Sequence, residues 1–174
     1  MATRKTKKAT KRKPIPAANS RQLLRHTVAT LAYRGGKSLR GAPAGFSEFR
    51  IGESTRAPGQ ILAHIGDLLD WGLSLAEGAQ KWRNAEIRSW DEDTQRFFDA
   101  LGAFDSFLAS KKALGCPPEL LFQGPIADAL THIGQISMLR RLAGAPVRAE
   151  NYQKAEIKTG RVGAKQAAPK MEFD

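Results

Sequence analysis

Two side chains four residues apart, Asp128 and His132, are the first candidates for chemistry in this chain. They lie in a stretch of apolar, helix-forming sequence, and an α-helix places residues i and i+4 on the same face. A carboxylate and an imidazole on one face can bind one divalent metal ion, such as zinc, nickel or iron. A further histidine, His64, lies inside an earlier helix-forming segment. If the two helices pack side by side, the three residues predict a metal site with open coordination positions.

Each of these residues also has a purely structural interpretation. Asp128 could simply hold His132 through a hydrogen bond, since such pairs are common on helix faces. His64 lies among apolar residues and could be a packing histidine that bonds a backbone carbonyl. His26 lies off the apolar stripe of its segment, and we expect it to be exposed or structural rather than a ligand. Spacing alone leaves both interpretations of the metal candidates open.

Five further residues are expected to assist the site. Two of them, Asp67 and Gln135, stand three residues after a candidate histidine, and their side chains could orient an imidazole. Trp71 and Tyr152 would line the pocket, and Arg34 could hold an anionic part of a substrate.

The elements that must position these residues are four helices. In each of them apolar residues recur with a period of 3.6, which is typical of an amphipathic helix. Ser89 and Glu92 have the spacing of a capping box, so the third helix is expected to begin directly after Ser89. Gly35 and Gly36 are expected to end the first helix, and Gly124 is expected to open the fourth. The expected segments are residues 20–34, 58–78, 90–115 and 124–142.

These segments predict an all-α protein. Its fold is a four-helix bundle with a long crossover, residues 37–57, between helices 1 and 2. We divide the chain into a disordered basic tail (1–17), the bundle (18–158) and a C-terminal extension (159–174) with little patterning. A short amphipathic piece is predicted at residues 149–157, and no convincing strand pair is found.

The net charge of +11 is concentrated at the N-terminus. Residues 1–13 carry seven lysines and arginines and no acid, so the rest of the chain carries only +4. Such a block is expected to be disordered and to make at most weak nucleic-acid contacts. The single cysteine, Cys116, fits a reducing compartment, and no apolar run nears the roughly 20 residues of a membrane span. We therefore expect a soluble, cytoplasmic protein without membrane contact.

The chain resembles the DinB/YfiT-like metalloenzyme superfamily over about residues 20–157. The resemblance rests on two segments, LAHIGDLLDW at residues 62–71 and HIGQ at residues 132–135. In that superfamily helix four carries two histidines four residues apart, and helix two carries a third. His132 and His64 match two of these positions, and Asp128 stands at the remaining one in place of histidine. Aspartate is itself a metal ligand, so two histidines and one aspartate can still bind a divalent metal ion.

The resemblance implies a bundle in up-down-down-up order, a homodimer and a divalent ion held at one end of the bundle. Characterised members include metal-dependent transferases that activate a low-molecular-weight thiol. The first functional hypothesis is therefore a metal-dependent transferase or hydrolase acting on a small molecule. The alternative is a non-catalytic helical-bundle interaction module whose basic tail contacts nucleic acid or an acidic partner. A third is a family member that keeps the fold and has lost catalysis.

Overall fold

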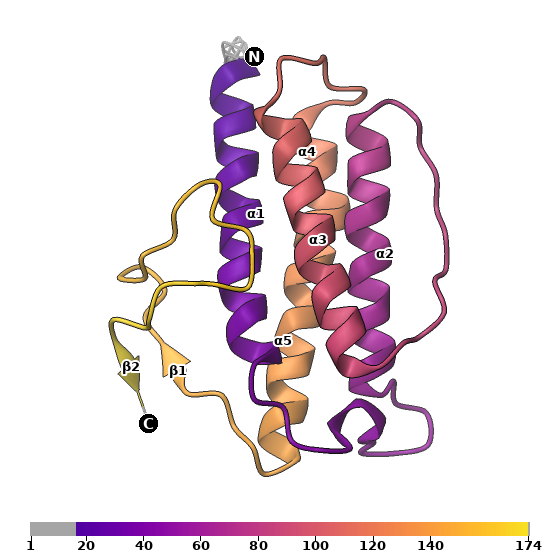
Figure 1. Cartoon of the computed structure of the whole chain (residues 1–174), viewed down its shortest axis with the longest axis vertical. Helices are drawn as coiled ribbons and strands as arrows, with labels where there is room; N and C mark the ends of the chain where they lie inside the picture. The colour runs from indigo at the N-terminus through magenta and orange to yellow at the C-terminus, as the bar shows by residue number, and fades with distance from the viewer. Residues whose placement is uncertain (1–16, 174) are drawn as a thin grey trace, which may run out of the picture.

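Four long helical rods lie side by side in the computed structural model, which describes residues 17–173 (Figure 1). The all-α four-helix bundle is thereby confirmed. The predicted basic tail, residues 1–17, lies outside the described residues except for Ala17, where the first helix begins. The rods are α1 (Ala17–Leu39), α2 (Pro58–Ala76), α3 (Trp90–Ala109) and a fourth that combines α4 (Pro118–Leu121), a π-helical turn (Phe122–Ile126) and α5 (Ala127–Leu142).

The four rods run in up-down-down-up order, as the family resemblance implies. The long connection after α1, residues 40–57, crosses one end of the bundle and contains a short 3-10 turn, Phe46–Glu48. The segment that travels the whole length of the bundle is residues 77–89, which leads from α2 to α3 (Figure 1). As a result α2 and α3 are parallel, and their C-terminal ends meet where the Gly115 N–H donates to the Ala76 carbonyl at 2.8 Å.

The predicted apolar stripes form the core of the bundle. Phe97 and Phe104 of α3 are fully buried, as are Leu31 of α1 and Ile65 of α2. The capping box is also confirmed, because Ser89 accepts from the Glu92 N–H and Glu92 accepts from the Ser89 N–H. Leu23 of α1 falls in the apolar repeat of the sequence but is 63% exposed and does not belong to the core. None of the described helices is both long and apolar enough to cross a membrane.

The expectation that Gly35 and Gly36 end the first helix is wrong, because α1 continues to Leu39. The two glycines serve packing. A Cβ atom on Gly35 would lie 2.4 Å from Cζ of Phe97, so only the absence of a side chain lets α1 and α3 approach this closely.

Replacing Gly35 with alanine is therefore expected to destabilise the fold. The added methyl group collides with the buried ring of Phe97, and overpacking of this kind lowers the free energy of unfolding by about 1–3 kcal/mol. Gly102 in α3 is the matched control, since a Cβ there meets nothing within 4 Å and Gly102→Ala should stabilise by up to about 1 kcal/mol. Urea denaturation of both variants tests this, and an unchanged midpoint for Gly35→Ala would contradict it.

The fourth rod begins at Pro118, earlier than the expected start at Gly124. Pro125 has no N–H to donate, and the rod accommodates it in the π-helical turn rather than breaking there. Across from it, a Cβ on Gly72 would lie 3.1 Å from the Pro125 ring. This close approach packs α2 directly against the segment that leads into α5.

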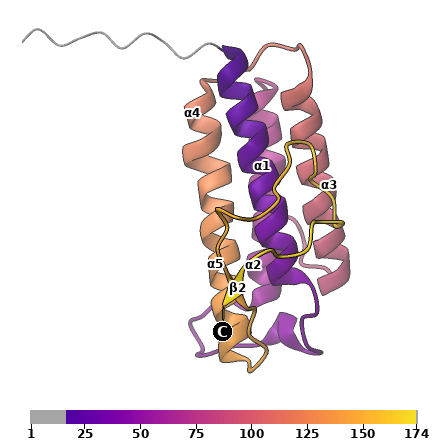
Figure 2. The ribbon, with the colours of Figure 1, turned by 90° about the vertical axis from the view of Figure 1, so that its left-hand side faces the viewer.

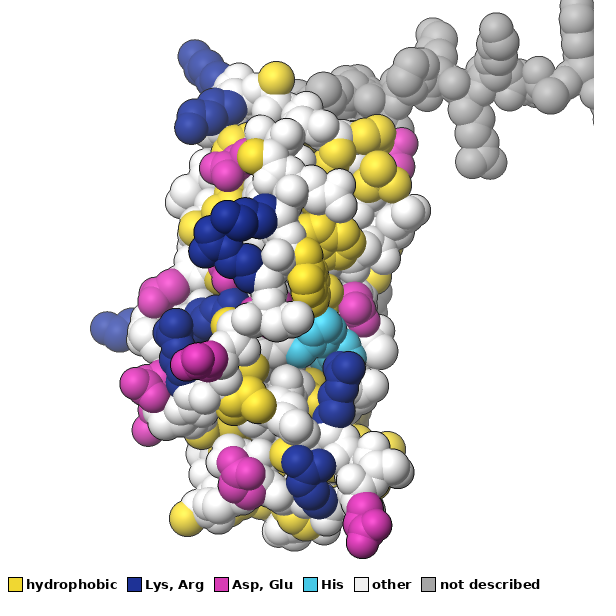
Figure 3. Space-filling model, turned by 90° about the vertical axis from the view of Figure 1, so that its right-hand side faces the viewer, with side chains coloured by type: hydrophobic (Ala, Val, Ile, Leu, Met, Phe, Trp, Pro, Cys, Tyr) yellow, Lys and Arg dark blue, Asp and Glu magenta, His cyan; other side chains and the backbone are white. Residues whose placement is uncertain are grey.

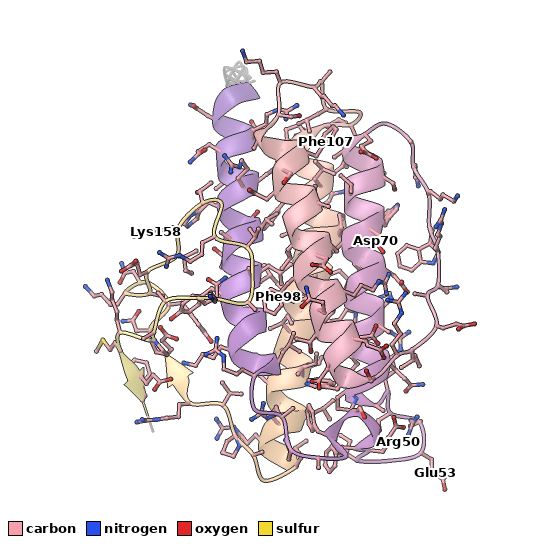
Figure 4. The ribbon with its side chains drawn as sticks, in the orientation of Figure 1. Arg50, Glu53, Asp70, Phe98, Phe107 and Lys158 are labelled. Carbon is pink, nitrogen blue, oxygen red and sulfur yellow. The ribbon has the colours of Figure 1, made fainter. Side chains whose placement is uncertain are left out.

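The C-terminal residues fold back onto α1 as far as residue 173 (Figure 2). Instead of the predicted amphipathic piece, Ala149–Glu150 forms a short strand, β1, which pairs antiparallel with β2, Glu172–Phe173. Lys37 of α1 binds both strands, at 2.8 Å from Glu150 and 2.7 Å from Glu172. Lys158 lies in the loop between the strands, beside α1 (Figure 4). The predicted C-terminal extension, residues 159–174, therefore packs on the bundle over its described part.

Arg140, near the end of α5, ties this rod to the end of α1. Its guanidinium group is buried and donates to the carbonyls of Ser38, Arg40 and Gly41 at 2.9–3.1 Å, and to that of Ala145 at 2.9 Å. These carbonyls have no partner within a helix, and a positive charge at a helix C-terminus is favourable. Burial lowers the pKa of Arg140 from its ordinary value, and the guanidinium group remains charged at neutral pH.

Candidate metal centre

The three predicted metal ligands come together in the structure. His64 lies in the second turn of α2, and Asp128 and His132 lie on consecutive turns at the start of α5. One ligand atom from each residue lies within 4.8 Å of the other two. The imidazole rings meet edge to face, with centroids 4.9 Å apart and planes at 81°. Two helices that are distant in the sequence therefore place two imidazoles and one carboxylate around a common point.

The hydrogen bond of His132 directs one ring nitrogen toward this point. Nδ1 lies 2.7 Å from Oε1 of Gln135. Since the amide oxygen can only accept, Nδ1 donates, and Nε2 of the neutral imidazole is left with its lone pair. Nε2 faces Oδ1 of Asp128 at 3.4 Å. Two acceptors at this separation repel each other unless His132 is protonated or a cation lies between them, which is the arrangement expected of two metal ligands.

His64 lacks the backbone partner that the structural interpretation required. Among residues 17–173 no hydrogen bond to its ring is present, and the ring packs against Trp82 with centroids 5.7 Å apart. Burial lowers the pKa of His64, and its electrostatic interactions with His132 and Arg56 lower it further, whereas the carboxylates of Asp128 and Asp67 act in the opposite direction. The neutral imidazole is thus favoured, which is the form that binds a metal ion.

The site is open to solvent on one side. The side chain of His132 is 12% exposed and that of Asp128 is 47% exposed. On the face of the molecule that carries α2, histidine surface is visible between hydrophobic side chains and basic ones (Figure 3). A small molecule can therefore reach the ligands without a change in the fold.

Of the five residues expected to assist the site, Gln135 contacts the candidate metal ligand His132 directly. Trp71 does not contact a candidate ligand and is connected to His64 only through Trp82. The Trp71 ring packs edge to face on Trp82, with centroids 5.8 Å apart, and Trp82 in turn packs on His64. Asp67 does not orient an imidazole. Its buried carboxylate accepts from Arg96 at 2.7 Å and from a backbone N–H, because the guanidinium charge stabilises it there.

Arg34 and Tyr152 belong to a different part of the molecule. The Arg34 guanidinium lies over the Tyr152 ring, 4.5 Å from its centroid, and Tyr152 packs edge to face on Tyr33 of α1. This cluster joins the C-terminal segment to α1, and neither residue lines the groove beside His132. His26, as expected, is exposed on α1; it is not among the three residues of the metal cluster.

A groove of about 670 Å³ borders the candidate ligands, and sequence reasoning missed it. Its walls come from α5, from Ile61 of α2 and from the loop that precedes α2. This loop lies at the lower end of the bundle in Figure 4, where its residues Arg50 and Glu53 are labelled. Two other residues near the ligands were missed, Arg56 in the loop and Trp82 in the 77–89 segment. An isolated tryptophan in a polar connection was the one available signal, since it implies a packing partner.

Comparison of the chain with protein-family models, with curated proteins and with solved structures finds no match. The resemblance to the DinB/YfiT-like superfamily therefore stays a prediction that rests on the two short segments around His64 and His132.

Proposed function

We propose that the protein holds a divalent metal ion through His64, Asp128 and His132 and is a metal-dependent transferase or hydrolase for a small molecule. One observation carries the proposal, which is the approach of three ligand atoms from two helices to within 4.8 Å of one another. Zinc, nickel and iron(II) all accept two imidazoles and a carboxylate.

Ligand atoms about 2.0–2.2 Å from an ion lie roughly 3.4 Å from each other in tetrahedral geometry. Asp128 and His132 already have this separation, at 3.4 Å, whereas ligand atoms up to 4.8 Å apart must approach by roughly 1 Å. The Asp128 side chain is half exposed and can make this movement. Three protein ligands also leave open positions for further ligands, which is typical of catalytic rather than structural sites.

The surrounding residues support such a role. A bound divalent ion supplies a Lewis acid that makes water or a thiol a stronger nucleophile at neutral pH. Gln135 fixes the ring of His132, and Trp82 covers one face of His64. A low-molecular-weight thiol is the nucleophile that the family resemblance suggests, and water is the alternative.

Metal analysis of the untagged protein, purified without chelator, tests the proposal. We expect close to one zinc, nickel or iron ion per chain, and loss of that ion in His64→Ala because a ligand is removed. His26→Ala is the matched control, since it removes an exposed histidine outside the cluster and should leave the metal content unchanged. Protein that contains no metal, and takes up none when zinc is added, would contradict the proposal and favour the interaction-module interpretation.

A further inference from the structure

The groove beside His132 has an apolar wall. Met138 is 58% exposed, Leu142 52% and Ile51 56%, and these large side chains line it together with Ile61 and Leu139. Apolar side chains grouped around one concave surface are typical of a ligand-binding site. Its volume of about 670 Å³ falls within the roughly 300–1,000 Å³ of small-molecule pockets, and is small for a folded partner.

The hydroxyl groups of the groove are already satisfied within the protein. Thr55 donates to the Gly52 carbonyl at 2.7 Å, and Thr131 donates to the Ala127 carbonyl at 3.0 Å. Neither hydroxyl group therefore has a free hydrogen to donate to a polar ligand. The groove therefore has few polar groups with which to bind the body of a sugar or a peptide, and it favours an apolar body.

One charged side chain in the groove has no partner. Arg56 makes no ion pair or hydrogen bond with any residue of the described range 17–173, so its guanidinium group is available to a ligand in the groove that it lines. Arg56 lines the groove together with His132, one of the candidate metal ligands. Arg56 thus places a positive charge where the groove meets the candidate ligands, and a guanidinium group is well suited to a carboxylate.

The charge of the metal site adds to that of Arg56. A divalent ion held by two neutral imidazoles and one carboxylate leaves a net charge of +1, so this end of the groove attracts an anion. The other end, at Leu142, carries no charged lining residue. The two ends of the groove therefore suit the two ends of an amphipathic molecule.

We propose that the groove binds small organic carboxylates with an apolar body, and that these are the substrate class of the metal site. The carboxylate binds at Arg56, and the apolar body lies along Ile51, Met138 and Leu142. The substrate assignment rests on the proposed metal-dependent function, whereas carboxylate binding in the groove is tested independently of it.

Calorimetric titration with octanoate at low salt tests the inference on the full-length protein, with the zinc content of each sample measured first. We expect saturable binding, weakened about tenfold by Arg56→Gln because a charge-assisted contact is lost. Arg83→Gln removes an exposed arginine outside the groove and should bind like the wild type. Octanamide, which has the same body without the charge, should bind about as weakly to the wild type as octanoate binds to Arg56→Gln.

A second variant examines the apolar wall. Met138 is largely exposed, so Met138→Asp should fold normally and weaken octanoate binding by placing a carboxylate beside the alkyl chain. Absence of octanoate binding in zinc-loaded wild type overturns the inference and leaves the metal proposal intact. Equal affinity for octanoate and octanamide, or in wild type and Arg56→Gln, also overturns it. Octanoate binding through Arg56 in protein that contains no metal and takes up no added zinc would support the groove assignment while contradicting the metal proposal.

Discussion

Replacing His132 with alanine is expected to abolish zinc binding while the bundle stays folded. The residue supplies the ring nitrogen that faces Asp128, and its own orientation is fixed by Gln135. Removal of an outer partner alone usually weakens metal affinity by about 10–100-fold, so loss of a ligand should weaken it by more than about 100-fold. Zinc titration with a competing chelator measures the affinity, and circular dichroism checks the fold. Unchanged affinity would exclude His132 as a ligand.

Variants at Asp128 separate a ligand from a simple hydrogen-bond partner. If the carboxylate binds the ion, Asp128→Ala and Asp128→Asn both lose affinity, whereas Asp128→His retains it because imidazole is also a ligand. If Asp128 only forms a hydrogen bond with His132, Asp128→His should bind the metal no more tightly than Asp128→Ala does. The side chain is half exposed, so none of these changes should disturb the core.

The largest expected effect on stability is at Arg140. Arg140→Met removes a buried guanidinium group and leaves the carbonyls of Ser38, Arg40 and Gly41 without donors. An unsatisfied buried carbonyl costs about 1–3 kcal/mol; this applies in full to Ser38, which is buried, and only in part to the exposed residues Arg40 and Gly41. We therefore expect the free energy of unfolding to fall by about 2–4 kcal/mol. Urea denaturation measures the change.

Two further variants test whether the loss of stability in Arg140→Met comes from the lost carbonyl contacts. Arg141→Met changes the exposed neighbour on the same helix and should alter the free energy of unfolding by less than about 0.5 kcal/mol. Arg140→Lys keeps the positive charge at the end of α1 but lacks the planar fork that reaches several carbonyls, so its loss should be intermediate. If Arg140→Met were as stable as Arg141→Met, the carbonyl contacts would have no stabilising role.

Local patterns in the sequence identified the helices and their inward faces. A capping box is complete within four residues, and the stripe that includes Phe97 and Phe104 repeats with the helical period, so both can be recognised without knowledge of distant contacts. The i, i+4 spacing likewise placed Asp128 and His132 on one face. The approach of His64 needed only the assumption that its helix packs beside theirs.

Features that depend on distant neighbours could not be predicted in this way. Gly35 resembles a helix terminator until Phe97 is seen to occupy the space beside it. Pro125 resembles a helix start because the π-helical turn that accommodates it has no sequence signature of its own. Asp67 was expected at an imidazole, but Arg96, 29 residues away in the sequence, binds its carboxylate instead. In each case a tertiary contact overrides the local preference.

The division of the metal ligands between α2 and α5 has a consequence for how the chain is held together. Its single cysteine is free, so no disulfide joins one part of the described chain to another. An ion at His64, Asp128 and His132 would act as a crosslink that closes a loop containing all of α3, and its binding energy would count toward folding. Chelation would then loosen the two helices whose separation sets the width of the groove.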